Sequence, residues 1–119
     1  MTANDALDPV WKALSDSTRR SILDLLRDGP KRTTDIVNAF PALSRFGVMK
    51  HLDVLKEAQL VIAERDGRTV INRLNAVPLR RIYERWVSQF EDLWASQLLR
   101  IQEFAEDSQS PEKDESNGV

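Results

Sequence analysis

The 119-residue sequence contains no cysteine and one histidine, His51. A chain without cysteine forms no disulfide, offers no thiolate nucleophile and has no sulfur ligand for a soft metal ion. A single imidazole does not make a metal site, and no glycine-rich phosphate loop or catalytic constellation accompanies it. We therefore expect no metal, no cofactor and no enzymatic activity, and we expect His51 to hydrogen-bond backbone or phosphate.

Long apolar runs are also missing. No stretch approaches the roughly 18 consecutive apolar residues that a membrane-spanning helix needs. The first residues, MTANDALDPVWKALS, have neither the basic start nor the apolar run of a secretory signal. Together with the lack of cysteine, these features predict a soluble protein of the cytoplasm with no membrane partner.

The formal net charge is only −2, but the charge is unevenly distributed. Residues 106–119 hold five acidic side chains against one lysine, whereas residues 16–75 hold eleven basic side chains against eight acidic ones. The basic excess in the middle of the chain leaves a polyanionic partner possible there. The polar, non-periodic residues 106–119 are predicted to be a disordered acidic tail, residues 1–8 an N-terminal arm, and residues 9–105 a single domain.

Apolar residues at helical spacing predict two helices in the first quarter of the chain. The first starts at Pro9 with Asp8 as its cap, because proline suits the first turn of a helix. The second starts after a cap at Asp16 or Ser17 and ends before Gly29. The apolar residues that share one side of the first helix are Val10, Trp11 and Leu14.

Two further helices follow. The third is short, with Thr33 or Thr34 as its cap and Pro41 as its stop. The fourth is capped by Ser44 and runs to about Ala58. Its buried face is predicted to hold Val48, Leu52 and Leu55.

Two runs rich in valine and isoleucine, Leu60–Arg65 and Thr69–Leu74, predict the strands of a β-hairpin. They are joined through the sequence RDGR, in which Asp66-Gly67 is a dipeptide favoured by two-residue primed turns. The inward face of the hairpin stays open, because its apolar residues come in adjacent pairs and do not alternate.

A helical apolar stripe begins at Pro78 and continues for almost thirty residues, as one long helix. A core of this size cannot cover such a helix with its several aromatic residues, so a second copy of the same helix is the expected partner. The residues predicted to form a dimer interface, taken from this helix and the first one, are Val10, Trp11, Leu14, Ile82, Trp86, Phe90, Leu93, Trp94 and Ile101.

The order of four helices, a hairpin and a long helix predicts a mainly α fold with a two-stranded β-hairpin, the winged helix-turn-helix. In this fold the fourth helix is the recognition helix and RDGR is the tip of the wing. The exposed face of the fourth helix would then meet the major groove of double-stranded DNA.

At this point the sequence resembles the ArsR/SmtB family of bacterial winged-helix repressors. The resemblance is carried, over roughly residues 9–105, by the segments ALSDSTRRSILDLL, LSRFGVMKHLDVLKEAQLV and RDGRTVINRLN, in this order and spacing. It implies a homodimer, paired through the first and last helices, that represses transcription from operator DNA until an effector acts; it does not name the effector.

The sequence departs from many members of this family. The third helix lacks their cysteine pair and the last helix lacks their histidine ligands, so the resemblance is to the members without these metal sites. The family also commonly has glycine where Gln59 stands. If Gln59 is in the left-handed conformation, it carries a strain of about 1 kcal/mol.

The predicted DNA-binding residues fall into two groups. Those on the recognition helix are Ser44, Arg45, Phe46, Met49, Lys50 and His51, and those on the wing and before the third helix are Arg65, Arg68, Arg73, Lys31, Arg32, Thr33 and Thr34. Arg45 and Lys50 would bind bases or phosphates, and both alternatives stay open. Phe46 and Met49 would either touch thymine methyl groups or pack on the third helix.

The functional prediction is a homodimeric, sequence-specific repressor that binds two half-sites of a pseudo-palindromic operator, one helical turn or more apart. Regulation of its own gene is left open at this point. The alternative is a winged-helix adaptor that binds protein through its last helix and does not bind DNA specifically. Salt-dependent binding to duplex DNA distinguishes the two.

Overall fold

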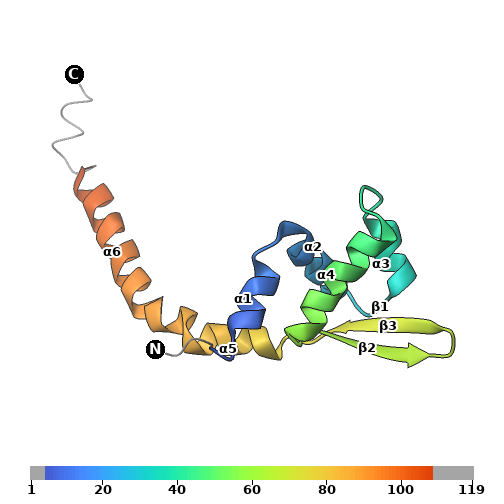
Figure 1. Ribbon diagram of the computed structural model, residues 1–119. Coiled ribbons are helices and arrows are strands. Elements are labelled where there is room, and N and C mark those ends of the chain that lie inside the picture. Colours follow the sequence, from blue (N-terminus) through green and yellow to red (C-terminus); the bar gives the residue numbers. More distant parts are fainter. Residues whose placement is uncertain (1–4, 109–119) are drawn as a thin grey trace, which may run out of the picture. The chain divides into compact units, whose positions relative to one another are not determined.

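The computed structural model describes residues 5–108, which form two compact units, one up to Ile82 and one from Tyr83 onward (Figure 1). The first unit is a winged helix-turn-helix, as predicted. Its elements are α1 (Asp8–Leu14), α2 (Ser17–Arg27), β1 (Lys31–Arg32), α3 (Thr33–Ala39), α4 (Arg45–Glu57), β2 (Val61–Asp66), β3 (Thr69–Leu74) and the greater part of α5 (Val77–Arg85). The second unit holds the end of α5, the 3-10 helix η1 (Val87–Phe90) and α6 (Glu91–Ser108).

The core of the first unit is formed by side chains of α2, α3 and α4 and by the residues that connect α4 to the wing. Its fully buried apolar side chains are Ile22, Ile36, Val48, Leu52, Leu55 and Leu60. Three of these come from α4 at positions separated by four and three residues, which places them on one helix face. The apolar spacing therefore identified the inner face of α4, and the opposite face is left for solvent or a ligand.

Two of the predicted caps are confirmed and two are wrong. The side chains of Asp16 and Ser44 accept the backbone N–H groups of Arg19 and Gly47 at 3.1 and 3.0 Å. Asp8 is the first residue of α1, after a Leu7 N-cap that makes no side-chain cap bond, and α3 begins at Thr33 after Arg32. In both helices the N-cap side chain accepts no hydrogen bond from the first backbone N–H groups. The residue preferences at helix starts did not predict this.

The end of α4 is a Schellman motif, which aims the chain into the wing. The N–H of Leu60 donates to the carbonyl of Leu55 and the N–H of Gln59 to that of Lys56, both at 2.9 Å. Gln59 has φ 61°, the only positive φ of a non-glycine residue in the described chain. The strain expected at Gln59 is therefore real, and a glycine would remove it.

Gln59→Gly is expected to raise the free energy of unfolding by up to about 1 kcal/mol, because glycine adopts this φ without steric cost. Urea unfolding of the full chain measures the change. Asn75 donates to the Gln59 backbone carbonyl at 2.8 Å, and a glycine keeps this bond. A lower stability of the variant would show that the Gln59 side chain contributes more than its strain costs.

The wing is larger than the predicted hairpin. β1 pairs with β3 opposite Asn72 and Ile71, so the sheet has three antiparallel strands in the order β1-β3-β2. A two-residue strand gives too short a pattern to recognise in the sequence. The turn also differs: Asp66 pairs with Thr69, so the central residues are Gly67 and Arg68, and of these only Gly67 has a positive φ. Glycine at the first central position is typical of a type II′ turn.

The predicted long helix is interrupted. α5 ends at Arg85, Trp86 leaves the helical region at φ −124°, and one 3-10 turn precedes α6. The Ser88 hydroxyl donates to the carbonyl of Glu84 at 2.8 Å, a local bond that competes with the regular helix. Glu91 and Asp92 then begin α6, where acidic side chains are favoured by the helix dipole. The continuous apolar stripe concealed this break.

The predicted N-terminal arm and the predicted C-terminal tail each overlap the described residues in part. α6 extends to Ser108, so the first three residues of the predicted tail, residues 106–108, are helical. Residues 109–119 of that tail and residues 1–4 of the N-terminal arm lie outside the described residues.

Candidate nucleic-acid interface

The outer face of α4 begins with a cation and an aromatic ring. Arg45 and Lys50 are exposed, and Phe46 has 71% of its surface exposed. The Lys50 Nζ atom lies 5.2 Å from the centroid of the Phe46 ring, within the range of a cation–π interaction. Phe46 therefore presents most of its apolar surface to solvent at the start of the recognition helix.

A notch separates the start of α4 from the wing. It has a volume of about 230 Å³, and we call it the wing notch. Its lining residues are Arg32, Thr33, Thr34, Arg45, Met49, Arg68, Thr69 and Val70. Six of these were among the predicted DNA-binding residues, so residues distant in sequence are brought to one concave surface. Met49 is half-buried in the notch wall.

The arginines of the wing differ in whether their guanidinium groups have a partner in the described chain. Arg73 forms an ion pair with Glu64 across the β2–β3 ladder, with Nε 2.9 Å from Oε1. Within residues 5–108, no hydrogen bond or ion pair engages the exposed side chains of Arg65 and Arg68 on the wing or of Arg45 on α4. These three guanidinium groups are available to an anion, whereas Arg73 is partly neutralised.

Thr33 has a structural role. Its side chain is buried, and its hydroxyl oxygen accepts from the Nδ2 atom of Asn72 at 3.0 Å. Asn72 is fully buried on β3 and also donates to the backbone carbonyl of Lys31 at 3.2 Å. The amide thus ties α3 and β1 to the wing strand. Sequence analysis missed Asn72, because a polar residue in a strand carries no sign of such a role.

Arg32 is paired before any ligand arrives. Its Nε and Nη2 atoms donate to the two carboxylate oxygens of Asp35, each at 3.1 Å. This hydrogen-bonded guanidinium lowers the pKa of the Asp35 carboxyl, so Asp35 is ionised at neutral pH. Lys31 precedes Arg32 and is half-exposed.

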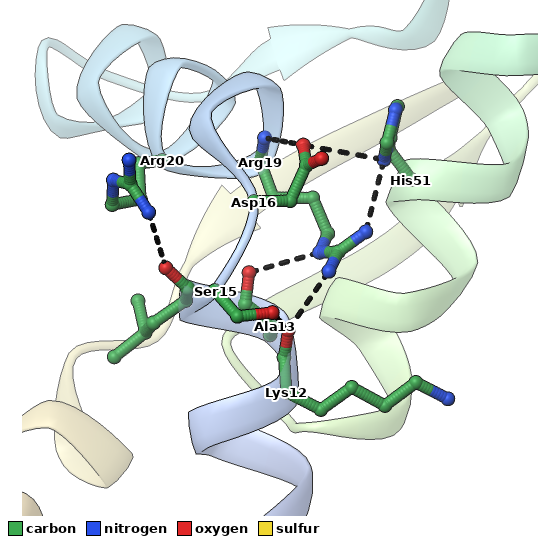
Figure 2. A network of polar contacts seen from close by, with 8 residues as sticks. Lys12, Ala13, Ser15, Asp16, Arg19, Arg20 and His51 are labelled. Atoms are coloured by element: carbon green, nitrogen blue, oxygen red, sulfur yellow. Dashed lines mark hydrogen bonds and ion pairs between the residues drawn. The ribbon is translucent and has the colours of Figure 1, made fainter.

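His51 faces other protein groups across a polar network that joins three helices (Figure 2). Its Nδ1 atom lies 3.2 Å from Nη1 of Arg19 and 3.8 Å from a carboxylate oxygen of Asp16. Because a guanidinium only donates, Nδ1 is the acceptor in this arrangement. Arg19 also donates to the carbonyls of Lys12 and Ala13 at the end of α1, at 2.8 and 2.9 Å.

Two further hydrogen bonds, from the Arg20 side chain and from the Arg19 backbone, support this network. The Arg20 guanidinium donates to the carbonyl of Leu14 at 2.6 Å, so both arginines satisfy carbonyl groups at the end of α1. The Arg19 N–H that donates to the Asp16 carboxylate lowers the pKa of that carboxyl. Only 23% of the His51 side chain is exposed. His51 is thus placed to fix α4 against α1 and α2, and we do not assign it to base contact.

The second unit exposes a long apolar surface. No residue of α6 is buried, although the helix carries large apolar side chains. The exposed ones in this unit are Tyr83, Trp86, Phe90, Leu93, Trp94, Leu98, Leu99, Ile101 and Phe104. An exposed apolar surface of this extent is typical of an interaction site. Of the other predicted interface residues, Trp11 is exposed, Leu14 is half-buried, and Val10 and Ile82 already belong to the core of their own unit.

Residues 5–108 contain neither a cluster of metal-ligating side chains nor a helix suited to a membrane. No group of three or more histidine, cysteine, aspartate or glutamate side chains in residues 5–108 is arranged to hold a metal ion. No helix in the same part of the chain has the length and apolar character required to cross a membrane.

Comparisons with known proteins agree with this geometry. The family model described as "Bacterial regulatory protein, arsR family" matches residues 16–63. The transcriptional repressor SdpR of Bacillus subtilis is 38% identical over 74 residues, which cover 62% of this chain and 81% of SdpR. An ArsR-like transcriptional regulator from Rhodococcus superposes with a TM-score of 0.66 at 29% identity, over 86% of this chain and 92% of the other. The homodimeric winged helix-turn-helix DNA-binding domain of a possible ArsR-family regulator from Mycobacterium bovis superposes with a TM-score of 0.58 at 26% identity, over 78% and 94%.

Proposed function

The chain belongs to the ArsR family of bacterial, DNA-binding transcriptional regulators, and we propose that it is a homodimeric repressor acting on a pseudo-palindromic operator in the cytoplasm. The repressor role is proposed by analogy with the transcriptional repressor SdpR, and the homodimer by analogy with the relative from Mycobacterium bovis. Control of its own gene is part of the proposal. The family is one of regulatory proteins, which agrees with the expectation that the chain is not an enzyme.

One observation carries the proposal. The exposed face at the start of α4 and the wing notch together present Arg45, Phe46, Lys50 and Arg68 on two elements. Within residues 5–108 the two guanidinium groups have no partner. The N-terminal part of a recognition helix is the part that reaches base edges, and a wing lies along the backbone beside it. An arginine there can donate two hydrogen bonds to guanine, and exposed apolar carbon can contact thymine methyl groups.

Two arginine substitutions test the placement of this interface. Arg45→Ala is expected to cost about 1–3 kcal/mol of binding free energy and to relax the preference among sequences, because a base contact is lost. Arg68→Ala is expected to weaken binding to every duplex alike, because a phosphate contact carries no sequence information. Gel-shift titration of DNA from upstream of the gene, against a random duplex, measures both. If both variants bind as the parent does, the interface lies elsewhere.

Phe46 gives a separate prediction. We expect its ring to contact the C5-methyl group of a thymine, so replacing the thymines of the bound site with uracil lowers the affinity of the parent. The affinity of Phe46→Ala should be nearly insensitive to this replacement. The comparison needs four titrations, with parent and variant on each DNA. Equal sensitivity of the two proteins to uracil would exclude Phe46 as the methyl contact.

The exposed apolar face of α6 supports the homodimer. A second copy of the same helix would cover its tryptophan and leucine side chains, and the symmetry of such a dimer would match that of a pseudo-palindromic operator. Two recognition helices would then enter the major groove about one helical turn apart, or a multiple of one turn.

A further inference from the structure

The wing notch collects arginines from three different elements. Arg32 comes from β1, Arg45 from the first turn of α4 and Arg68 from the turn of the wing. Asp35 offsets part of the charge of Arg32, whereas the side chains of Arg45 and Arg68 have no partner within residues 5–108. The concave surface of about 230 Å³ therefore keeps an excess of positive charge, which favours a bound anion. Guanidinium groups also match the geometry of phosphate oxygens better than other cationic side chains do.

The hydrogen-bonding state of the lining residues shows which donors remain for such an anion. The Thr69 hydroxyl already donates to the carbonyl of Asp66, and the Thr33 hydroxyl, which accepts from Asn72, is buried. The exposed Thr34 hydroxyl has no partner in the described chain, and neither does the Arg68 guanidinium. Arg32 gives Nε and Nη2 to Asp35, which leaves Nη1 available.

The walls of the notch strengthen this electrostatic attraction. Met49 and Val70 are half-buried and supply apolar surface between the cationic groups. Apolar walls exclude part of the water that would otherwise screen a charge placed in the notch. The site is therefore better suited to a bound phosphate than three isolated surface arginines would be.

We propose that the wing notch of each protomer seats one phosphodiester group of the duplex backbone, held by Arg32, Arg68 and the Thr34 hydroxyl. The inference rests on the proposed function and adds to it a defined phosphate site between recognition helix and wing. Arg45 forms the wall that the notch shares with the outer face of α4. Sequence preference then comes from that face and not from the notch.

Asp35 limits the strength of this site. Its carboxylate takes two of the donors of Arg32 and places a negative charge beside the seat of the phosphate. A phosphate that enters must share Arg32 with Asp35 and is repelled by it. The carboxylate thereby weakens attachment to DNA of any sequence, which makes the affinity depend more strongly on the base contacts of α4.

Salt dependence tests the site on the full-length protein. In Arg32→Ala and in Arg68→Ala the slope of log affinity against log potassium chloride should fall by about 0.9 for each lost contact, which is about 1.8 for a dimer. The loss of affinity should be equal for the upstream duplex and for a random one. Arg27→Ala is the matched control, because Arg27 lies outside the notch and pairs with Asp24 at 3.7 Å.

The outcomes separate this inference from the proposed function. If the parent binds duplex with a steep salt dependence and both notch variants behave as Arg27→Ala does, the notch is not a phosphate site although the protein binds DNA. If the parent itself shows no salt dependence, the proposed function fails first. Circular dichroism of each variant confirms that the compared proteins are folded.

Asp35→Asn provides a test in the opposite direction, which a loss of folding cannot imitate. It should raise the affinity for a random duplex, and the rise should be smaller in an Arg32→Ala background, because the two side chains act on the same phosphate. A lower affinity of Asp35→Asn would overturn the role assigned to Asp35.

Inorganic pyrophosphate tests the other source of the same ligand chemistry. At constant ionic strength it should raise the Tm of the parent less than duplex DNA does. A larger rise with pyrophosphate, lost in Arg32→Ala and Arg68→Ala, would assign the notch to a free anion and overturn its assignment to the DNA backbone.

Discussion

Leu52→Ala is expected to lower the free energy of unfolding by about 2–5 kcal/mol, the range for leucine truncation in a packed core. Leu52 has no exposed surface and lies at the centre of the inner face of α4, between Val48 and Leu55. The cost combines the lost burial with the cavity left behind. Urea unfolding at a fixed protein concentration measures it, because dimerisation makes stability concentration-dependent.

The neighbouring residue supplies the control. Asp53 is exposed and pairs with Lys56 at 3.8 Å, so Asp53→Ala should change stability by less than about 1 kcal/mol. The two substituted residues are adjacent on the recognition helix, and one is buried whereas the other is exposed. A Leu52→Ala protein as stable as Asp53→Ala would mean that the inner face of α4 has been misassigned.

Trp94→Glu is expected to convert the dimer to a monomer and to reduce operator affinity by about 10²–10⁴-fold, because the second half-site no longer binds as part of one molecule. In a single chain 49% of Trp94 is exposed. The proposed dimer would bury it, and a carboxylate at a buried interface without a partner is strongly unfavourable. Sedimentation velocity and gel-shift titration measure the two effects.

Ser96→Glu adds the same charge two residues along α6, about 200° around the helix axis from Trp94 and so on its other side. It should leave both the oligomeric state and the affinity for DNA close to those of the parent. If Trp94→Glu sediments as the parent does, α6 does not form the dimer interface through this face, and the exposed tryptophan needs another explanation.

The sequence was sufficient for the fold where local signals were strong. Three kinds of local signal were specific enough to predict structure. They are the caps at Asp16 and Ser44, the apolar spacing of Val48, Leu52 and Leu55, and the glycine of the wing turn. These signals act over three or four residues, so they determine local structure without tertiary contacts. They predicted the helix-turn-helix and the hairpin correctly.

The sequence was insufficient where tertiary contacts decide the structure. The strand at Lys31–Arg32 exists because β3 lies beside it, and the break at Trp86 interrupts a stripe whose spacing alone favours a continuous helix. Thr33 was predicted to contact DNA, but it bonds to Asn72, a residue 39 positions away in the sequence. His51 was predicted from its place on the recognition helix, yet it turns toward Arg19 and Asp16. Pairing partners distant in sequence leave no mark on either segment alone.

The candidate site was predictable as a set of basic residues but not as a geometry. Arg45 was predicted from its place on the recognition helix, Arg32 from its place before the third helix and Arg68 from the cluster of arginines around the wing. The structure places all three at one notch. The pairing of Arg32 with Asp35 and of Arg73 with Glu64 separates engaged arginines from free ones. Only the positions of the side chains make this distinction, which decides the expected contribution of each residue.

The most direct test is the affinity of the full chain for duplex DNA, measured by fluorescence anisotropy at increasing potassium chloride. Cationic side chains from two protomers should displace counterions from six or more phosphates. The affinity should then fall by roughly 10³-fold or more between about 50 and 200 mM salt. An affinity that stays constant over this range would contradict binding through these arginines and would favour the alternative of a protein-binding adaptor.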